Sequence, residues 1–191
     1  YLLMFHLFKK KIGLAFGAGS ARGLAHIGVI KELEKNNIAI DYIAGTSIGA
    51  IVGGFYAYTK DIKALEDLAH SQGYKEMFEA FFDPSMKSGV FKGEKVLNML
   101  GEYIPDDVLV QDTKIPFAAI ATDINTAQKV VIKEGSLKTA IRASMSIPLL
   151  FKPVEYGKQI LIDGGNTDPV PVDVVRDMGA QRVIGVNLYS Q

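Results

Sequence analysis

The stretch Ile40-Asp-Tyr-Ile-Ala-Gly45-Thr46-Ser47-Ile48-Gly49-Ala50 joins two segments of different character. The apolar run at 38–43 predicts a strand, and the small residues at 50–58 predict a helix. Gly45-x-Ser47-x-Gly49, with Thr46 and Ile48 in between, is the spacing of a strand-to-helix turn that exposes a strained serine. Glycine accepts such a turn without a Cβ clash, and the first N–H groups of a helix favour a developing anion. This context favours a nucleophile over a serine that only caps the helix.

The segments around this turn alternate between strand and helix patterns. Ile12–Phe16 predicts a first strand, and 24–34 has apolar residues at helical spacing. Further strands are predicted at 115–121, 129–133, 160–163 and 182–188, and further helices at 61–70, 94–103, 136–145 and 172–178. This alternation predicts an α/β fold with three α/β/α layers and a central, mainly parallel sheet. Residues 71–93 interleave aromatic residues with glycine and proline, which favours a flap over a site or an insertion that contacts lipid.

The length fits one domain, which we place at 12–191. Residues 1–11 form an N-terminal extension that is apolar and then basic. This pattern indicates either a leftover segment ahead of a start at Met4 or a membrane-surface anchor, and its charge order is the reverse of a secretory signal. We therefore expect a cytoplasmic protein with peripheral, transient contact to a membrane surface.

The composition excludes several classes of protein. The 21 Lys and Arg residues balance 21 Asp and Glu residues, so the chain lacks the electrostatic footprint of a nucleic-acid-binding protein. There is no cysteine, hence no disulfide framework and no thiolate chemistry. The three histidines lack the spacing of a zinc site, so we expect no metal. No apolar stretch is long enough to span a bilayer.

A glycine-rich loop follows the first predicted strand and is formed by Gly17, Ala18, Gly19, Ser20, Ala21, Arg22 and Gly23. Such a loop can cradle an oxyanion with its N–H groups, or it can hold the pyrophosphate of a dinucleotide. The second interpretation expects an acidic residue at the end of the second strand, whereas Asp41 lies near its start. Tyr56 and Lys60 resemble a dehydrogenase dyad but come too early in the chain. The oxyanion role is favoured, and a loop that only packs helix against strand is the other alternative.

A serine nucleophile needs a base. No histidine follows His70, so the order serine, acid, histidine of the α/β-hydrolases cannot be built on Ser47. His26 and His70 are conceivable bases, but nothing in the sequence orients His26, and a core or capping role is commoner. Asp163 is the better candidate, because it ends a predicted strand at the Gly164-Gly165 turn and can reach the carboxyl edge of the sheet. A desolvated carboxylate can take a serine proton, whereas the alternative is an aspartate that only caps the turn.

Taken together, these segments resemble the three motifs of the patatin-like phospholipase family. The motifs are Gly17-Ala-Gly-Ser-Ala-Arg22-Gly23, Gly45-Thr-Ser47-Ile-Gly49 and Asp163-Gly164-Gly165, and the likeness extends over roughly 12–188. The resemblance implies a patatin-like fold and a lipid acyl hydrolase with a Ser47–Asp163 dyad and no cofactor. It implies that amides around Gly19 and Ser20 bind the oxyanion, and that the substrates are phospholipid, lysophospholipid or neutral lipid esters. A non-catalytic, regulatory lipid-binding relative is the alternative.

One departure from the family pattern concerns the loop. Three consecutive glycines often precede x-Arg-Gly in the family, and here Ala18, Gly19 and Ser20 take those positions. Arg22 either assists through its charge or braces the loop. Family members usually continue beyond the last predicted strand, so we expect the chain to be a C-terminally shortened version of the domain.

Overall fold

The computed structural model describes residues 10–71, 98 and 100–189. The flap predicted at 71–93 lies outside these residues except for its first position, and the helix predicted at 94–103 is described only in its second half. The helical elements are η1 (Ser20–Gly23), α2 (Leu24–Lys35), α3 (Ile48–Thr59), α4 (Ile62–His70), η3 (Val110–Asp112), α7 (Leu137–Ser144), η4 (Gly164–Asn166) and α8 (Val172–Asp177). The strands are β1 (Ile12–Phe16), β2 (Tyr42–Thr46), β3 (Phe117–Asp123), β4 (Gln128–Ile132), β5 (Val154–Tyr156), β6 (Gln159–Asp163) and β7 (Arg182–Val186).

The strands form one mixed sheet in the order β5-β6-β3-β2-β1-β7, with β4 also paired to β3. Neighbouring strands among β7, β1, β2 and β3 run parallel, whereas β4 and β6 are antiparallel to β3, and β5 is antiparallel to β6. The prediction of a mainly parallel sheet in an α/β fold is therefore confirmed. β3 and β4 form an antiparallel hairpin.

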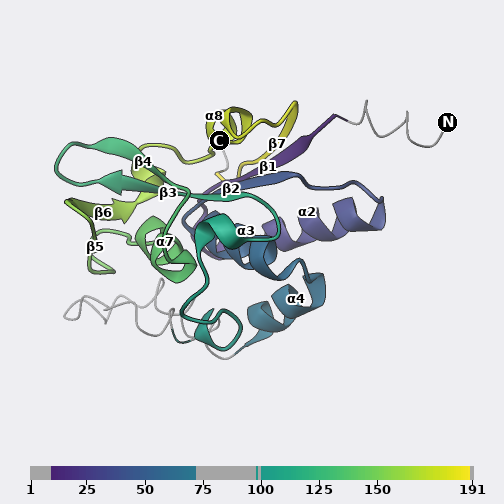
Figure 1. Ribbon diagram of the computed structural model, residues 1–191, viewed down its shortest axis with the longest axis horizontal. Helices are drawn as coiled ribbons and strands as arrows, with labels where there is room; N and C mark the ends of the chain where they lie inside the picture. Colours follow the sequence, from purple (N-terminus) through teal and green to yellow (C-terminus); the bar gives the residue numbers. More distant parts are fainter. Residues whose placement is uncertain (1–9, 72–97, 99, 190–191) are drawn as a thin grey trace.

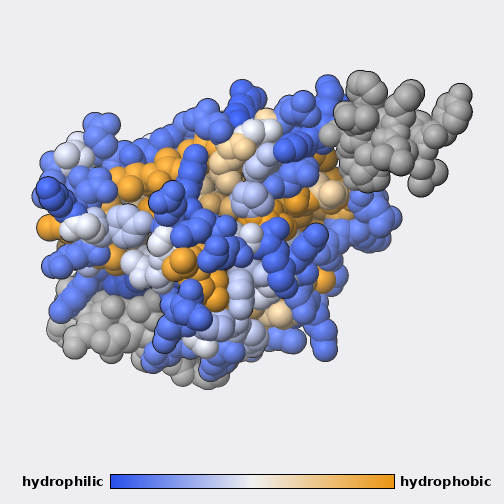
Figure 2. Space-filling model, viewed as in Figure 1, coloured by the Kyte–Doolittle hydropathy of each residue, from blue (hydrophilic) through white to orange (hydrophobic). Residues whose placement is uncertain are grey.

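Helices cover both faces of the sheet, which gives the three predicted layers (Figure 1). α8 packs on one face, where Val174 and Val175 meet the small side chains of Ala15, Ala44 and Ala118. Helices α2, α3 and α7 lie on the other face, whose larger core includes these sheet residues: Leu14, Phe16, Ile43, Phe117, Ala119, Ala121, Ile132 and Leu161. Neighbouring residues of one strand fall into different cores because successive side chains of a strand point to opposite faces. On the face seen in Figure 2, the hydrophobic residues that are visible at the surface form a broken band between polar surfaces.

The structure differs from the prediction at two strands. The second strand begins at Tyr42 instead of Ile38, because the Ile38 N–H group donates to the Leu33 carbonyl and closes the end of α2. Asn37 adopts a φ of 55° there, a left-handed conformation that is common at helix ends. β5 was not predicted, because three partly exposed residues carry too little periodicity to indicate a strand.

Candidate active site

Ser47 occupies the sharp turn between β2 and α3. Its φ and ψ are 57° and −121°, a conformation that a residue with a side chain rarely adopts. The flanking glycines are needed for packing: a Cβ on Gly45 would lie 2.2 Å from the Gly49 carbonyl oxygen, and a Cβ on Gly49 would lie 2.2 Å from the Phe16 carbonyl oxygen. The Ser47 N–H group donates to Ser144 Oγ at 2.9 Å, which fixes the turn from the side of α7.

Asp163 approaches Ser47 through the pairing of β3. β4 pairs with Ala119 to Asp123, so it occupies one edge of β3 alone, and β2 and β6 must share the other edge. β2 reaches Ile120 with its last residue, and the antiparallel β6 reaches Ala121 with its last residue. The carboxyl ends of β2 and β6 therefore point at each other along one edge of β3, which brings Ser47 and Asp163 together.

This geometry corrects the reason given for Asp163. The sequence suggested that it ends a strand and can reach the carboxyl edge of the sheet, without giving the direction of that strand; β6 runs antiparallel and reaches this edge from the opposite direction. The physical reason is that β3 extends beyond the end of β2 and offers β6 the free part of the same edge.

The Asp163 carboxylate is buried, with 6% of the residue exposed. Its Oδ1 accepts the Gly165 N–H at 2.7 Å, and its own backbone N–H donates to the Ser146 carbonyl at 2.9 Å. Oδ2 is buried and meets no donor at full hydrogen-bond geometry among the described residues. Burial raises the Asp163 pKa, and the nearby Ser47 hydroxyl and the Gly165 N–H oppose the rise. The Ser47 hydroxyl is thus close to Asp163 but not in ideal geometry with it, which is common in unliganded sites.

Part of the glycine-rich loop has N–H groups without an acceptor. Gly17 N–H donates to the Val186 carbonyl at 3.0 Å and Ala18 N–H to the Pro169 carbonyl at 2.9 Å, so neither is available to a ligand. Within the described part of the chain, no acceptor pairs with the N–H groups of Gly19, Ser20 and Ala21. The amides of Gly19 and Ser20, around which the sequence predicted the oxyanion donors, are thus available, and their role stays a prediction.

Arg22 braces the loop through its side chain. Its Nη1 donates to the Leu188 carbonyl at 2.8 Å, which ties the loop to the segment after β7. Of the two roles considered for Arg22, the contact supports the bracing role. Ser20 stands where the family often has glycine and has a φ of 49°, so the turn keeps a glycine-like conformation despite the side chain.

The two candidate histidine bases do not line the pocket. His70 is on α4, where its Nδ1 lies 2.7 Å from the Glu66 carbonyl oxygen. His26 is fully buried in α2, and its Nε2 lies 2.8 Å from the Gly17 carbonyl oxygen. The expectation that nothing orients His26 was wrong, because its partner is a loop carbonyl that no sequence pattern reveals.

A pocket of about 540 Å³ opens between these groups. Its lining residues are Ala18, Gly19, Ser20, Ala21, Arg22, Ser47, Ile147, Pro148, Asp163, Gly165, Asn166, Leu188 and Tyr189. The other predicted site residues lie outside this lining and shape the turns behind it: Gly17, Gly23, Gly45, Thr46, Ile48, Gly49 and Gly164. The sequence gave no indication that Leu188 and Tyr189 complete the wall, since they are brought there only by the pairing of β7 with β1.

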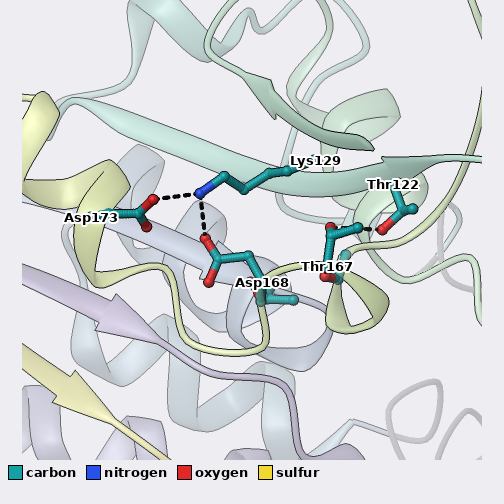
Figure 3. Close-up of polar contacts among 7 residues, drawn as sticks. Thr122, Lys129, Thr167, Asp168 and Asp173 are labelled. Carbon is teal, nitrogen blue, oxygen red and sulfur yellow. Dashed lines mark hydrogen bonds and ion pairs between the residues drawn. The ribbon is translucent and has the colours of Figure 1, made fainter. Parts of the chain in front are cut away.

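The segment after Asp163 links the parts of the site. The Asp168 carbonyl accepts the Thr46 hydroxyl at 2.8 Å, and the neighbouring Pro169 carbonyl accepts the loop N–H of Ala18. Figure 3 shows how this segment is held: Thr167 and Thr122 hydroxyls lie 2.9 Å apart, and Lys129 from β4 pairs with Asp168 at 3.0 Å and Asp173 at 2.5 Å. Nothing in the sequence singled out Lys129 or Thr122.

The remaining alternatives receive no support from the site. Asp41 Oδ2 accepts the Ile12 N–H at 2.8 Å, at the amino ends of the strands and away from the glycine-rich loop. The Tyr56 hydroxyl donates to Glu34 instead of pairing with Lys60. Among residues 10–71, 98 and 100–189, no group of three metal-binding side chains is found and no helix is long and apolar enough to cross a membrane.

Comparison with known proteins identifies the family. The model of the family described as "Patatin-like phospholipase" matches residues 14–176. The chain belongs to the patatin-like phospholipase family. An uncharacterised NTE family protein of Mycobacterium tuberculosis is 36% identical over 181 residues, which are 93% of this chain and 49% of the relative. Human patatin-like phospholipase domain-containing protein 6 is 32% identical over 185 residues, 94% of this chain and 13% of the relative.

A solved structure has a similar fold. The crystal structure of VipD from Legionella pneumophila matches with a TM-score of 0.58 over 82% of this chain and 46% of that chain. The sequence identity is 14%, so this likeness concerns the fold alone. The patatin-like chain described here spans about half the length of the mycobacterial relative and a small part of the human one.

Proposed function

We propose that this chain hydrolyses carboxylic-ester bonds of lipids through a Ser47–Asp163 dyad. The observation that carries the proposal is the meeting of Ser47 and Asp163 at the ends of β2 and β6, in one pocket with the unpaired amides of Gly19 and Ser20. Family membership supports a lipid ester as the substrate class. Phospholipids, lysophospholipids and neutral lipids are the candidate esters.

The geometry suggests a two-step reaction. Asp163 takes the proton of the Ser47 hydroxyl as Oγ attacks the ester carbonyl, and the resulting oxyanion is bound by the N–H groups of Gly19 and Ser20. The leaving alcohol receives the proton from Asp163, and the acyl group stays on Ser47. Asp163 then deprotonates a water molecule that attacks the acyl-enzyme, and it gives this proton to Ser47 Oγ as the acyl–Oγ bond breaks and the acid leaves. This chemistry needs neither a metal ion nor an organic cofactor.

The pocket rim supports a second part of the proposal, contact with a lipid surface. Leu149 follows Pro148 of the pocket wall, is 93% exposed and has a φ of 73°. Tyr189, which also lines the pocket, is 53% exposed. A large apolar side chain held in a strained conformation beside a site favours a functional role. We propose that Leu149 contacts the lipid aggregate from which the substrate enters.

Hydrolysis of a phospholipid and of a water-soluble ester tests the proposal. Ser47→Ala and Asp163→Asn should each abolish release of the acid from both substrates. Ser71→Ala at the end of α4 and Asp177→Asn at the end of α8 are matched controls, because both positions lie outside the pocket, and they should keep wild-type rates. Full activity in both dyad variants would overturn the dyad, and lipid binding without any ester cleavage in wild type would favour a non-catalytic relative.

The variant Leu149→Ser tests the proposed lipid contact separately from the proposed dyad. Hydrolysis of phospholipid vesicles should fall while hydrolysis of the soluble ester stays unchanged, because only the first reaction needs surface contact. Equal rates of vesicle hydrolysis in wild type and Leu149→Ser would contradict the lipid contact and leave the dyad untouched.

A further inference from the structure

His26 is a buried polar side chain to which the proposed reaction assigns no step. It lies on the first turn of α2, no part of it is exposed, and its ring packs 4.7 Å from the ring of Phe16. Its Nε2 lies 2.8 Å from the carbonyl oxygen of Gly17, and its Nδ1 is buried without a partner among the described residues. Burying an imidazole nitrogen without a hydrogen-bond partner lowers the stability of the fold. We therefore ask which role the one hydrogen bond of His26 has.

The partner of His26 fixes its protonation state. A carbonyl oxygen only accepts hydrogen bonds, so Nε2 must carry the hydrogen. Protonation of Nδ1 would bury an N–H group that has no acceptor, and burial accordingly lowers the His26 pKa to about 4. The side chain is therefore a neutral, permanently oriented donor at neutral pH and cannot act as the general base for Ser47.

The carbonyl that His26 holds belongs to a peptide unit fixed at both ends. The Gly17 carbonyl accepts from His26, and the N–H of the same peptide unit, on Ala18, donates to the Pro169 carbonyl at 2.9 Å. Two peptide units later, the Gly19 carbonyl accepts the Arg22 N–H at 3.1 Å, and the Ser20 N–H of that unit points the other way. The unit between these two bears the Gly19 N–H group, so the loop is held by the His26 contact on one side of that group and by the Arg22 contact on the other.

We propose that His26 is a positioning residue for the oxyanion loop, whose Nε2–H group holds the Gly17 carbonyl and so directs the Gly19 and Ser20 N–H groups into the pocket. The inference rests on the proposed function for its kinetic consequence. The proposal adds a residue from outside the pocket to those that position the oxyanion donors. It also gives the buried imidazole a role other than filling the core.

Two substitutions at position 26 separate this role from simple packing. His26→Gln keeps an N–H donor near the position of Nε2, whereas His26→Leu keeps volume and removes the donor. Misplaced catalytic groups typically cost about 100-fold, and loss of an oxyanion donor costs about 100- to 1,000-fold, in kcat. We expect His26→Leu to lower kcat by about 10- to 100-fold with little change in KM, and His26→Gln to recover to within about threefold of wild type.

The experiment counts active sites so that misfolded protein does not lower the apparent rate. Each variant is titrated with a fluorescent fluorophosphonate, and kcat for a soluble ester is expressed per labelled site. His70→Leu and His70→Gln are matched controls, because the contact of His70 among the described residues is with its own helix, and both should leave kcat unchanged. Equal kcat values per site for His26→Leu and wild type, or equal losses in His26→Leu and His26→Gln, would overturn the positioning role.

A measurement without turnover keeps the inference separate from the proposed function. If the wild type does not hydrolyse esters, the proposed function fails, but the backbone amide signals of Gly19 and Ser20 in an NMR spectrum still report loop orientation. His26→Leu should shift both signals strongly, and His26→Gln should largely restore them. Unchanged Gly19 and Ser20 signals in His26→Leu would contradict the inference whatever the activity.

Discussion

The burial of His26 makes the stability of this fold depend on pH in a defined window. Burial lowers the pKa of the imidazole from its ordinary 6.5 to about 4, and the hydrogen bond to Gly17 opposes only part of that change. As the pH falls below about 6.5, the unfolded chain takes up a proton at this position, whereas the folded chain stays neutral until about pH 4. The stability contribution is complete above the unfolded pKa and is lost as the pH falls toward the folded one.

The size of the effect follows from the two pKa values. A pKa difference of one unit corresponds to about 1.4 kcal/mol. Relative to neutral pH, the titration of His26 should therefore lower the free energy of unfolding of wild type by about 2 kcal/mol at about pH 5 and by about 3 kcal/mol at about pH 4. Urea denaturation of wild type and His26→Gln, at about pH 7.5 and about pH 5, measures this contribution. The groups shared by both proteins cancel in the difference, so the free-energy advantage of wild type should shrink by about 2 kcal/mol at the lower pH.

A constant difference between wild type and His26→Gln at the two pH values would refute this reasoning. It would mean that the imidazole titrates alike in the folded and unfolded chain, and hence that it is neither buried nor a fixed neutral donor. His70→Gln supplies the control, because within the described part of the chain the His70 ring contacts the Glu66 carbonyl of its own helix.

Three further predictions concern the framework and the base. Gly49→Ala would place a Cβ 2.2 Å from a backbone oxygen of β1, so it should lower the free energy of unfolding by about 1–3 kcal/mol or prevent folding. Gly28→Ala meets open space and should raise the free energy of unfolding by about 0.5–1 kcal/mol. Thermal or urea denaturation measures both. Lys129→Met leaves the largely buried Asp168 carboxylate without its cation and should lower the free energy of unfolding by about 1–3 kcal/mol. Combining Lys129→Met with Asp168→Asn should recover part of that loss. No recovery in the double variant would show that the lost ion pair is not the cause. Because burial raises the Asp163 pKa and only the carboxylate is a base, kcat/KM should fall with decreasing pH through a pKa above the ordinary 3.8, and an acid limb at or below that value would count against Asp163.

The parts of the fold that the sequence predicted are those written in local patterns. The turn at Ser47 could be recognised because glycines at 45 and 49 and a strand-to-helix change surround it, and close backbone packing explains both glycines. The parallel strands β1, β2 and β3 could be recognised because strands buried on both faces are continuously apolar.

The parts that the sequence did not predict depend on pairing between distant segments. The direction of β6 is set by the free edge of β3 beyond β2, and no feature of residues 159–163 encodes it. The contacts of Lys129 with Asp168 and Asp173 join β4 to residues that lie 39 and 44 positions later in the sequence. The role of Gly17 as the acceptor for His26 likewise arises from the folded path of a loop, which residue types alone do not determine.

Covalent labelling of Ser47 tests the central claim most directly. Wild type, Ser47→Ala and Asp163→Asn are treated with a fluorophosphonate, and the adduct is located by mass spectrometry of peptides. The account predicts one adduct, on Ser47, that is absent in Ser47→Ala and forms far more slowly in Asp163→Asn. Labelling of Ser47→Ala at the wild-type rate, or an adduct on another residue, would contradict the assignment of Ser47 as the nucleophile.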